Sequence, residues 1–405
     1  MRQGDGDPGR VARHIDDGER RRRLGARHGL AAGVGGGVDG SLAAARAVVC
    51  LHATEPASVH LSAWARSGVA RDEVDRALYA ERSVVKQLAM RRTVFAFPAE
   101  LLPAVWGSAS ARVAGQQRRR LAQEMQRAGI AADGETWAEQ QLETVRQMIA
   151  DDGPLTTAQV RAALPELDAR VTRGRGTYQA DVAVAASVVV ALAASGAIVR
   201  GENDGGWKTS RPRWTDAAQW LGEPPAPLSE TEGYAALVAA WLRAFGPGTE
   251  ADLVWWLGAT KAAVRRALCD VDAVPVSLDS GGAGWVLPDD VDPVPEPGSW
   301  VSLLPALDPT TMGWKERGFH LGPHAESVFD RNGNGGPTAW ADGRIVGVWC
   351  QPDGGEVEVV LVEDVPPATK RALDDKAAEL TAWLDGEVVR SIYLSPLART
   401  HLGRA

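Results

Sequence analysis

His52 and Thr54 are polar residues two positions apart, at the end of a predicted apolar helix. That helix begins at Ser41, which can cap it, and its apolar face comprises Leu42, Ala45, Val49 and His52. A neutral imidazole can orient a water molecule or take a proton from it, and a nearby hydroxyl can hold the same water. We therefore treat His52 and Thr54 as candidate catalytic residues for a hydrolytic reaction.

Side chains at positions i and i+2 point apart on a continuous helix, so this pair converges only where the helix ends. Pro56 favours such an end, because it biases Glu55 away from helical geometry. A helix C-terminus favours the charged imidazolium, and Glu55 either supplies a compensating negative field or is a solvated cap. The alternative is that His52 is a core histidine bonded to the backbone, since a lone histidine on an apolar face usually packs.

Basic residues gather at two places where loops meet predicted strands, and such residues can contact phosphate groups. One place joins a helix to a strand, and the other surrounds a Gly-rich hairpin. The candidate nucleic-acid contacts are Arg91, Arg92, Thr93, Arg173, Arg175, Arg200, Lys208, Arg211 and Arg213. Arg112 and Arg118–Arg120 lie on a further predicted helix, where a solvated basic face is the alternative to a nucleic-acid contact.

The net charge differs between the two halves of the 405-residue chain. Residues 1–214 carry 30 Lys and Arg against 24 Asp and Glu, a net of +6, whereas residues 215–405 carry 14 against 28, a net of -14. The overall charge of -8 taken alone argues against a nucleic-acid partner. The basic half instead suggests a polyanion-binding module joined to a different one.

One order of predicted elements, helices followed by an extended segment or hairpin, occurs three times. The starting helices begin near residues 41, 136 and 231, a spacing of about 95 residues. In the first copy the third helix runs from about Asp72 to Leu88, and the extended segment is Thr93–Phe97. In the second copy a long helix lies in 181–195, and Ala197–Arg200 pairs with Trp207–Ser210.

The third copy opens with the capping box Ser229-x-x-Glu232 and has helices at 232–245, 249–257 and 260–269. Its hairpin pairs Val274–Leu278 with Trp285–Leu287. Helix, helix, helix and hairpin is the order of a winged helix. The sequence therefore predicts three winged helices in tandem.

Beyond the Pro-rich stretch Pro288–Pro297 the pattern changes to strands, with one helix at 367–384. The predicted strands are Trp300–Leu307, a hairpin over Thr338–Trp349, Val357–Val362 and a closing strand near Val388–Leu394. The hairpin turns at Asp342-Gly343, a pair that readily adopts the positive φ angles of a type I′ turn. The predicted fold class is α+β, with three tandem winged helices followed by a β-rich, barrel-like C-terminal domain.

The predicted domain boundaries follow from these changes of pattern. Residues 1–40 comprise an N-terminal tail, a helix opened by Asp16-Asp17-Gly18-Glu19, and a Gly-rich connector. The winged helices span 41–130, 131–222 and 223–290, and the C-terminal domain spans 291–405. Gly35-x-Gly37-x-x-Gly40 matches a dinucleotide-binding fingerprint in form, but no strand precedes it, so it is interpreted as a flexible connector.

Several classes of site are disfavoured by residue type and spacing. Cys50, Cys269 and Cys350 lie far apart and offer neither a disulfide framework nor a zinc site, so reduced thiols in a cytoplasmic protein are expected. His320 and His324 are separated by Gly322-Pro323 and cannot form a helical metal pair. We expect no metal, no other cofactor and no membrane association.

Short motifs spread along the chain resemble those of the winged-helix DNA glycosylases of the YcaQ/AlkZ type, bacterial enzymes that act on alkylated and crosslinked DNA. The resemblance extends from about Asp16 to the end of the chain. The motifs are Val49-Cys-Leu-His-Ala-Thr-Glu-Pro56, Arg76-Ala-Leu-Tyr79, Met90-Arg-Arg-Thr93, Arg213-Trp214, Phe245-Gly-Pro247, Asp252-Leu-Val-Trp-Trp256, Leu303-Leu-Pro-Ala-Leu-Asp-Pro309 and Asp342-Gly-Arg-Ile-Val-Gly347.

The resemblance implies a DNA glycosylase that hydrolyses the N-glycosidic bond of purines alkylated or crosslinked at N7 or N3, with water as the nucleophile. It implies damaged double-stranded DNA as the partner, and nothing demands more than a monomer. The family carries Gln-x-Gln or Gln-x-Asp at the end of its first long helix, where this chain has His52-Ala53-Thr54. The alternative is a non-catalytic winged-helix DNA-binding protein, a regulator or lesion binder, in which His52 and Thr54 are structural.

Overall fold

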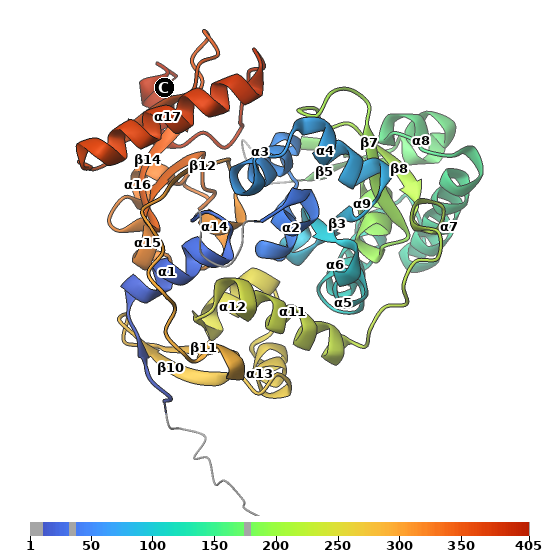
Figure 1. Ribbon diagram of the computed structural model, residues 1–405. Coiled ribbons are helices and arrows are strands. Elements are labelled where there is room, and N and C mark those ends of the chain that lie inside the picture. Colours follow the sequence, from blue (N-terminus) through green and yellow to red (C-terminus); the bar gives the residue numbers. More distant parts are fainter. Residues whose placement is uncertain (1–10, 32–37, 174–179, 405) are drawn as a thin grey trace, which may run out of the picture. The chain divides into compact units, whose positions relative to one another are not determined.

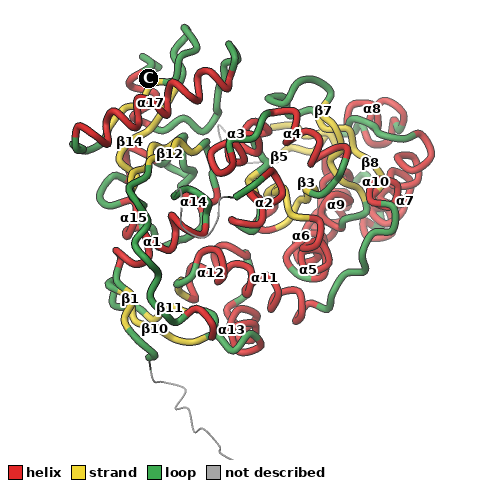
Figure 2. Tube along the Cα trace, in the orientation of Figure 1, coloured by secondary structure: helices red, strands yellow, loops and turns green. Residues whose placement is uncertain are grey.

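The computed structural model describes residues 11–31, 38–173 and 180–404, and it divides the chain into two compact units (Figures 1 and 2). Unit 1 combines Met1–Val74 with Tyr234–Ala405, and unit 2 is the inserted segment Asp75–Gly233. Most of the Gly-rich connector, the predicted disordered tail to residue 10, and Arg175 lie outside the described residues. The α+β class is confirmed by the mixture of helices and strands in both units.

Unit 2 is a set of helices interleaved with three hairpins. Its hairpins pair β3 (Val84–Ala89) with β4 (Thr93–Pro98), β5 (Arg170–Arg173) with β6 (Ala180–Ala183), and β7 (Ile198–Asn203) with β8 (Pro212–Asp216). Its helices include α5 (Leu102–Gly107), α6 (Ala109–Arg127), α7 (Gly134–Asp152), α8 (Thr157–Ala163), α9 (Val184–Ser195) and α10 (Ala217–Leu221). The predicted extended segment Thr93–Phe97 and the long helix in 181–195 are confirmed.

Two predictions for unit 2 were wrong. The third helix does not reach Leu88, because α4 (Arg71–Asp75) and a π-helical turn (Arg76–Ala80) end before Arg82, which has φ 57°. The fully buried strand β3 follows, and its β-branched Val84 and Val85 suit a pleated core. The second strand of the later hairpin is β8 rather than Trp207–Ser210, since a longer loop separates β7 from it.

A buried hydrogen-bond network joins β3, α5, α6 and α9 in unit 2. The Gln87 amide donates to Ser110 Oγ at 2.9 Å and to the Ala193 carbonyl at 2.6 Å, and it accepts from Trp106 Nε1 at 3.0 Å. Ser110 Oγ also lies 2.7 Å from the Leu88 carbonyl and 2.8 Å from the Ala194 carbonyl. Because these polar groups are buried, satisfying them fixes the hairpin against the helices.

The N-terminal part of unit 1 leads into the candidate catalytic triplet. It comprises β1 (His14–Ile15), α1 (Asp17–Arg27), α2 (Gly40–Ala47), β2 (Leu51–His52) and α3 (Pro56–Ser67). The helix opened by Asp16 is confirmed, because the Asp16 side chain accepts from the backbone N–H of Glu19.

The predicted helix from Ser41 to His52 was wrong in its second half. The helix α2 ends at Ala47, after which Val49 adopts a left-handed φ of 67° and the chain becomes extended at β2. Ser41 is not its cap either, since Asp39 occupies that position and the Ser41 hydroxyl donates to Glu73. Pro56 begins the next helix rather than ending the previous one.

The predicted helices of the third copy are confirmed as α11 (Glu230–Phe245), α12 (Glu250–Leu257) and α13 (Lys261–Asp270). The capping box between Ser229 and Glu232 also forms. A four-stranded sheet follows the order β1-β10-β11-β9, with β9 (Gly248–Thr249), β10 (Val274–Leu278) and β11 (Ala283–Val286). The parallel pairing of β1 with β10 brings the start of the chain into this sheet.

The C-terminal part of unit 1 is an open antiparallel sheet, not a barrel. Its strands are β12 (Val301–Leu304), β13 (Thr338–Ala341), β14 (Arg344–Cys350) and β15 (Glu358–Leu361), paired in chain order. The predicted type I′ turn is confirmed, with φ 48° at Asp342 and 81° at Gly343. Helix α17 (Pro367–Leu384) matches the predicted helix and lies along this sheet in Figure 1. Short helices α14 (Pro309–Met312), α15 (Gly318–Leu321), α16 (Ala325–Val328) and α18 (Pro396–His401) complete this part.

The prediction of a closing strand at Val388–Leu394 was wrong. Two backbone N–H groups of this segment donate to side chains instead of to a neighbouring strand. The N–H of Val389 donates to Gln351 Oε1 at 2.9 Å, and the N–H of Ile392 donates to Glu55 Oε1 at 2.9 Å. Among the described helices, none has the combination of length and apolar content that a membrane span requires.

Two histidines are completely enclosed in the core of unit 1. Burial, together with the nearby Arg66 guanidinium, lowers the pKa of His28 to about 3. Burial also lowers the pKa of His320 well below its ordinary value, and neither ring nitrogen of His320 has a hydrogen-bond partner among the described residues. The His320 ring instead packs between Trp314, Phe319 and Trp340.

The free energy of unfolding should therefore decrease as the pH falls below about 6.5, the ordinary histidine pKa. In that range the unfolded chain binds a proton at each of His28 and His320 that the folded protein does not bind. Each contributes a slope of about 1.4 kcal/mol per pH unit. Urea unfolding at pH 7.5 and 5.0 measures the slope. The variant H320F should reduce it by one proton equivalent, and an unchanged slope would contradict the assignment.

Candidate active site

His52 lies in a short extended segment immediately before α3. Its side chain is buried, with 7% of the residue exposed, and the Thr54 backbone N–H donates to its Nδ1 at 3.4 Å. In this contact Nδ1 is the acceptor, and the neutral tautomer compatible with it carries its proton on Nε2.

The structure keeps His52 and Thr54 close through the backbone of the triplet. Ala53 is buried, whereas Thr54 is half-buried. Strand β2 ends at His52, and Ala53 and Thr54 lie beyond it. The hydrogen bond from the Thr54 N–H to His52 Nδ1 is a contact that joins the two residues.

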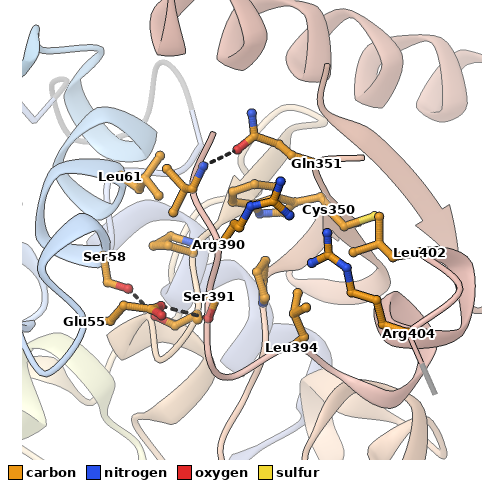
Figure 3. Close-up of a pocket in the computed structure, with 15 residues that line it drawn as sticks. Glu55, Ser58, Leu61, Cys350, Gln351, Arg390, Ser391, Leu394, Leu402 and Arg404 are labelled. Carbon is orange, nitrogen blue, oxygen red and sulfur yellow. Dashed lines mark hydrogen bonds between the residues drawn. The ribbon is translucent and has the colours of Figure 1, made fainter. Parts of the chain in front are cut away.

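Glu55 connects the triplet to the C-terminal segment of the chain. Its carboxylate accepts from Ser391 Oγ at 2.8 Å and from the Ile392 N–H at 2.9 Å, and a hydrogen bond also joins it to Ser58 in the first turn of α3 (Figure 3). Burial raises the pKa of Glu55 above its ordinary value, although these hydrogen bonds oppose the shift. Glu55 is thus not a solvated cap, because its carboxylate binds the loop at Ser391 and Ile392. Its position beside Pro56 in the sequence did not reveal this link.

A small cavity lies beside Glu55, between α3 and the C-terminal sheet (Figure 3). Its lining includes Ser58, Cys350, Gln351, Arg390 and Ser391. The volume of about 20 Å³ is enough for a single water molecule. A purine ring cannot enter it, so a base would have to approach the triplet from outside this cavity.

A buried ion pair fixes α3, and with it the triplet, to the segment that follows β12. Arg66 and Asp308 form two hydrogen bonds, at 2.7 and 2.9 Å, and both side chains are 0% exposed. Ser62 Oγ and the Thr310 N–H also donate to the Asp308 carboxylate. Burial alone would raise the pKa of Asp308, but the Arg66 guanidinium and these donors hold that pKa below its ordinary value.

The predicted DNA contacts lie in unit 2, on two of its hairpins and at the end of β5. Arg91 and Arg92 form the β3–β4 turn, with φ 55° and 59°, and are exposed, while Thr93 is half-buried. Arg173 ends β5.

The remaining four predicted contacts lie on the β7–β8 hairpin and its loop, and they differ in exposure. Lys208 and Arg211 are exposed, and Arg213 pairs with Asp204 at 2.9 Å. Arg200 is largely enclosed, and its guanidinium lies 5.2 Å from the centre of the Trp214 ring. Burial lowers the pKa of Arg200 to about 10, so it remains a cation at neutral pH.

Lys86 is a buried cation that sequence reasoning did not single out. Its Nζ donates to Tyr79 Oη at 2.6 Å, and burial with the nearby Arg200 charge lowers the pKa of Lys86 to about 7. The only signal in the sequence is a lysine inside the otherwise apolar strand Val84–Ala89. Within the described ranges, no cluster of three or more His, Cys, Asp or Glu is arranged to hold a metal ion.

The fold is similar to the solved structure of Streptomyces sahachiroi DNA glycosylase AlkZ, with a TM-score of 0.67 and 20% sequence identity over 93% of this chain and 98% of that chain. No curated protein sequence matches the chain. Residues 45–383 match the family model described as "DNA glycosylase AlkZ-like". The chain therefore belongs to the AlkZ-like DNA glycosylase family, as the separated motifs predicted.

Loss of the Asp308 carboxylate should strongly destabilise unit 1. The variant D308A leaves the Arg66 guanidinium buried without its anion, and breaking such a pair costs about 3–5 kcal/mol. Urea unfolding of D308A measures the loss. The control is D353A, since Asp353 is 87% exposed and its removal should change stability by less than about 0.5 kcal/mol. Equal stabilities for the two variants would contradict the role assigned to the pair.

Proposed function

We propose that this protein is a monofunctional DNA glycosylase that hydrolyses the N-glycosidic bond of purines alkylated or crosslinked at N7 or N3 in double-stranded DNA. Family membership supports glycosylase chemistry. The observation that carries the proposal is the hydrogen bond from the Thr54 backbone N–H to His52 Nδ1, which supports a joint role for these two residues just before α3. We expect the protein to act as a monomer in the cytoplasm, without a metal or other cofactor.

The chemistry asks little of a general base. Alkylation at N7 or N3 leaves a positively charged purine, which departs readily and leaves an oxocarbenium-like sugar. The enzyme must then position a water behind the anomeric carbon. The Nε2–H of a neutral His52 ring can donate a hydrogen bond to this water. The water can in turn donate a hydrogen bond to the Thr54 hydroxyl oxygen. Because α2 ends at Ala47, His52 does not lie at a helix C-terminus, so the reason to expect an imidazolium beside the developing cation is removed.

The second candidate is a DNA-binding protein without catalysis. One observation favours it, namely that His52 is 7% exposed and that its Nδ1 is engaged by the backbone of Thr54. Such contacts are also those of a satisfied core histidine. The two candidates differ in whether any base is released from damaged DNA.

Excision of N7-methylguanine from a duplex should depend on His52. H52A should lower the single-turnover rate about 100-fold, the lower end of the range for a positioned acid–base group. The double variant with H52Q and T54Q recreates the Gln-x-Gln pattern and should retain activity. Product is detected as strand breaks after alkaline cleavage of abasic sites. No breaks with the wild type, or an unchanged rate in H52A, would favour the non-catalytic candidate.

The exposed turn of the β3–β4 hairpin should contribute to DNA affinity through phosphate contacts. Replacing both Arg91 and Arg92 with alanine should reduce the slope of log affinity against log salt by about 1.8, close to 0.9 per lost phosphate contact. Fluorescence anisotropy with a labelled duplex at several salt concentrations measures the slope. R266A, which removes an exposed arginine on α13 that is not among the candidate contacts, is the control and should leave the slope unchanged. Equal slopes for all proteins would remove the turn from the interface.

A further inference from the structure

Ile392 is an exposed apolar side chain on a braced loop next to the candidate catalytic triplet. Three large apolar side chains are exposed in the part of the chain that the structure describes, and Ile392 is the most exposed of them at 74%. Val11 and Leu228 follow at 43% and 39%. A single exposed apolar residue is common on protein surfaces and does not by itself indicate a function. The surroundings of Ile392 must therefore supply the evidence for a function.

The loop that carries Ile392 is held rigidly, which is unusual for a connection without secondary structure. The Ile392 N–H donates to Glu55, whose carboxylate also accepts from Ser391 Oγ. The same Ser391 hydroxyl accepts from the Tyr393 N–H at 3.0 Å. The backbone on both sides of Ile392 is therefore fixed to the residue that follows Thr54, while its side chain points to solvent.

Basic side chains surround Ile392 although this half of the chain is acidic. Ile392 lines an open groove of about 610 Å³ together with Tyr393, Arg331, Arg399 and Arg404. The carboxylate in this groove, Asp330, is engaged by Asn334 and by backbone N–H groups of its own loop. The groove thus combines an apolar tip with cations, a combination that suits the stacked bases and phosphates of DNA.

We propose that Ile392 is a wedge that enters the base stack of duplex DNA when the damaged nucleotide is extruded, with the groove beside it holding the sugar–phosphate backbone. Extruding a base leaves a gap in the stack, and an apolar side chain that fills the gap compensates part of the unstacking cost. Isoleucine suits this role because its branched side chain has few rotamers to lose on insertion. The hydrogen bonds from the loop to Glu55 then fix the position of Ile392 relative to His52 and Thr54.

The proposal rests on the proposed function, and its test separates the two. I392A should excise N7-methylguanine from a paired duplex at least about tenfold more slowly than the wild type, the effect of losing part of the unstacking compensation. I392L keeps an apolar tip and should stay within about twofold. When the lesion lies opposite an abasic-site analogue, where the opposing stack is already broken, I392A should equal the wild type. L228A is the control, an exposed apolar residue with no place in the site.

A binding readout covers the case in which no base is released. A duplex with 2-aminopurine beside an abasic-site analogue reports unstacking by increased fluorescence. The wild type and I392L should raise the fluorescence, and I392A should not. If the wild type releases no base but this pattern holds, the glycosylase proposal fails and the wedge stands. Equal, measurable rates of base release by wild type and I392A on the paired duplex, or no fluorescence increase with the wild type, would overturn the wedge.

Discussion

The buried ion pair between Arg66 and Asp308 is the constraint on which the architecture of unit 1 depends. It joins residues 242 positions apart, and it brings the helix α3 against the segment that leaves β12. A buried ion pair is costly unless further hydrogen bonds satisfy its polar atoms, and here Ser62 and Thr310 supply such bonds, although Arg66 Nε has no partner among the described residues. The pair lies in the last turn of α3 and holds this helix, whose first turn directly follows the triplet, against the segment after β12.

A second link holds the triplet from the other side. Glu55, directly after Thr54, binds the backbone of the loop at Ser391 and Ile392, more than 330 positions further along the chain. Long-range contacts within unit 1 therefore hold both α3 and the residue that follows the triplet.

Sequence reasoning succeeded where local preferences agree with the tertiary structure. The bounds of α17 and the turn at Asp342-Gly343 follow from a proline at the start of a periodic segment and from residues that tolerate positive φ. It failed where distant side chains decide the conformation. The expected closing strand Val388–Leu394 loses its backbone donors to Gln351 and Glu55, and no pattern within those seven residues contains that information. The residues before Pro56 were predicted to end a helix, whereas α2 ends at Ala47 and His52 lies in a strand.

The distribution of charge also shows that a property summed over the sequence does not predict a local surface. The chain has a net charge of -8, and its C-terminal half is strongly acidic, yet that half contains a groove lined by Arg331, Arg399 and Arg404. Asp330 inside the groove is engaged in its own loop, and Arg404 is paired with the exposed Asp353. What a phosphate meets within a Debye length is the local potential, not the average over the chain. A negative net charge is therefore compatible with DNA binding at local basic surfaces, and the acidic remainder of the surface would weaken non-specific binding to DNA.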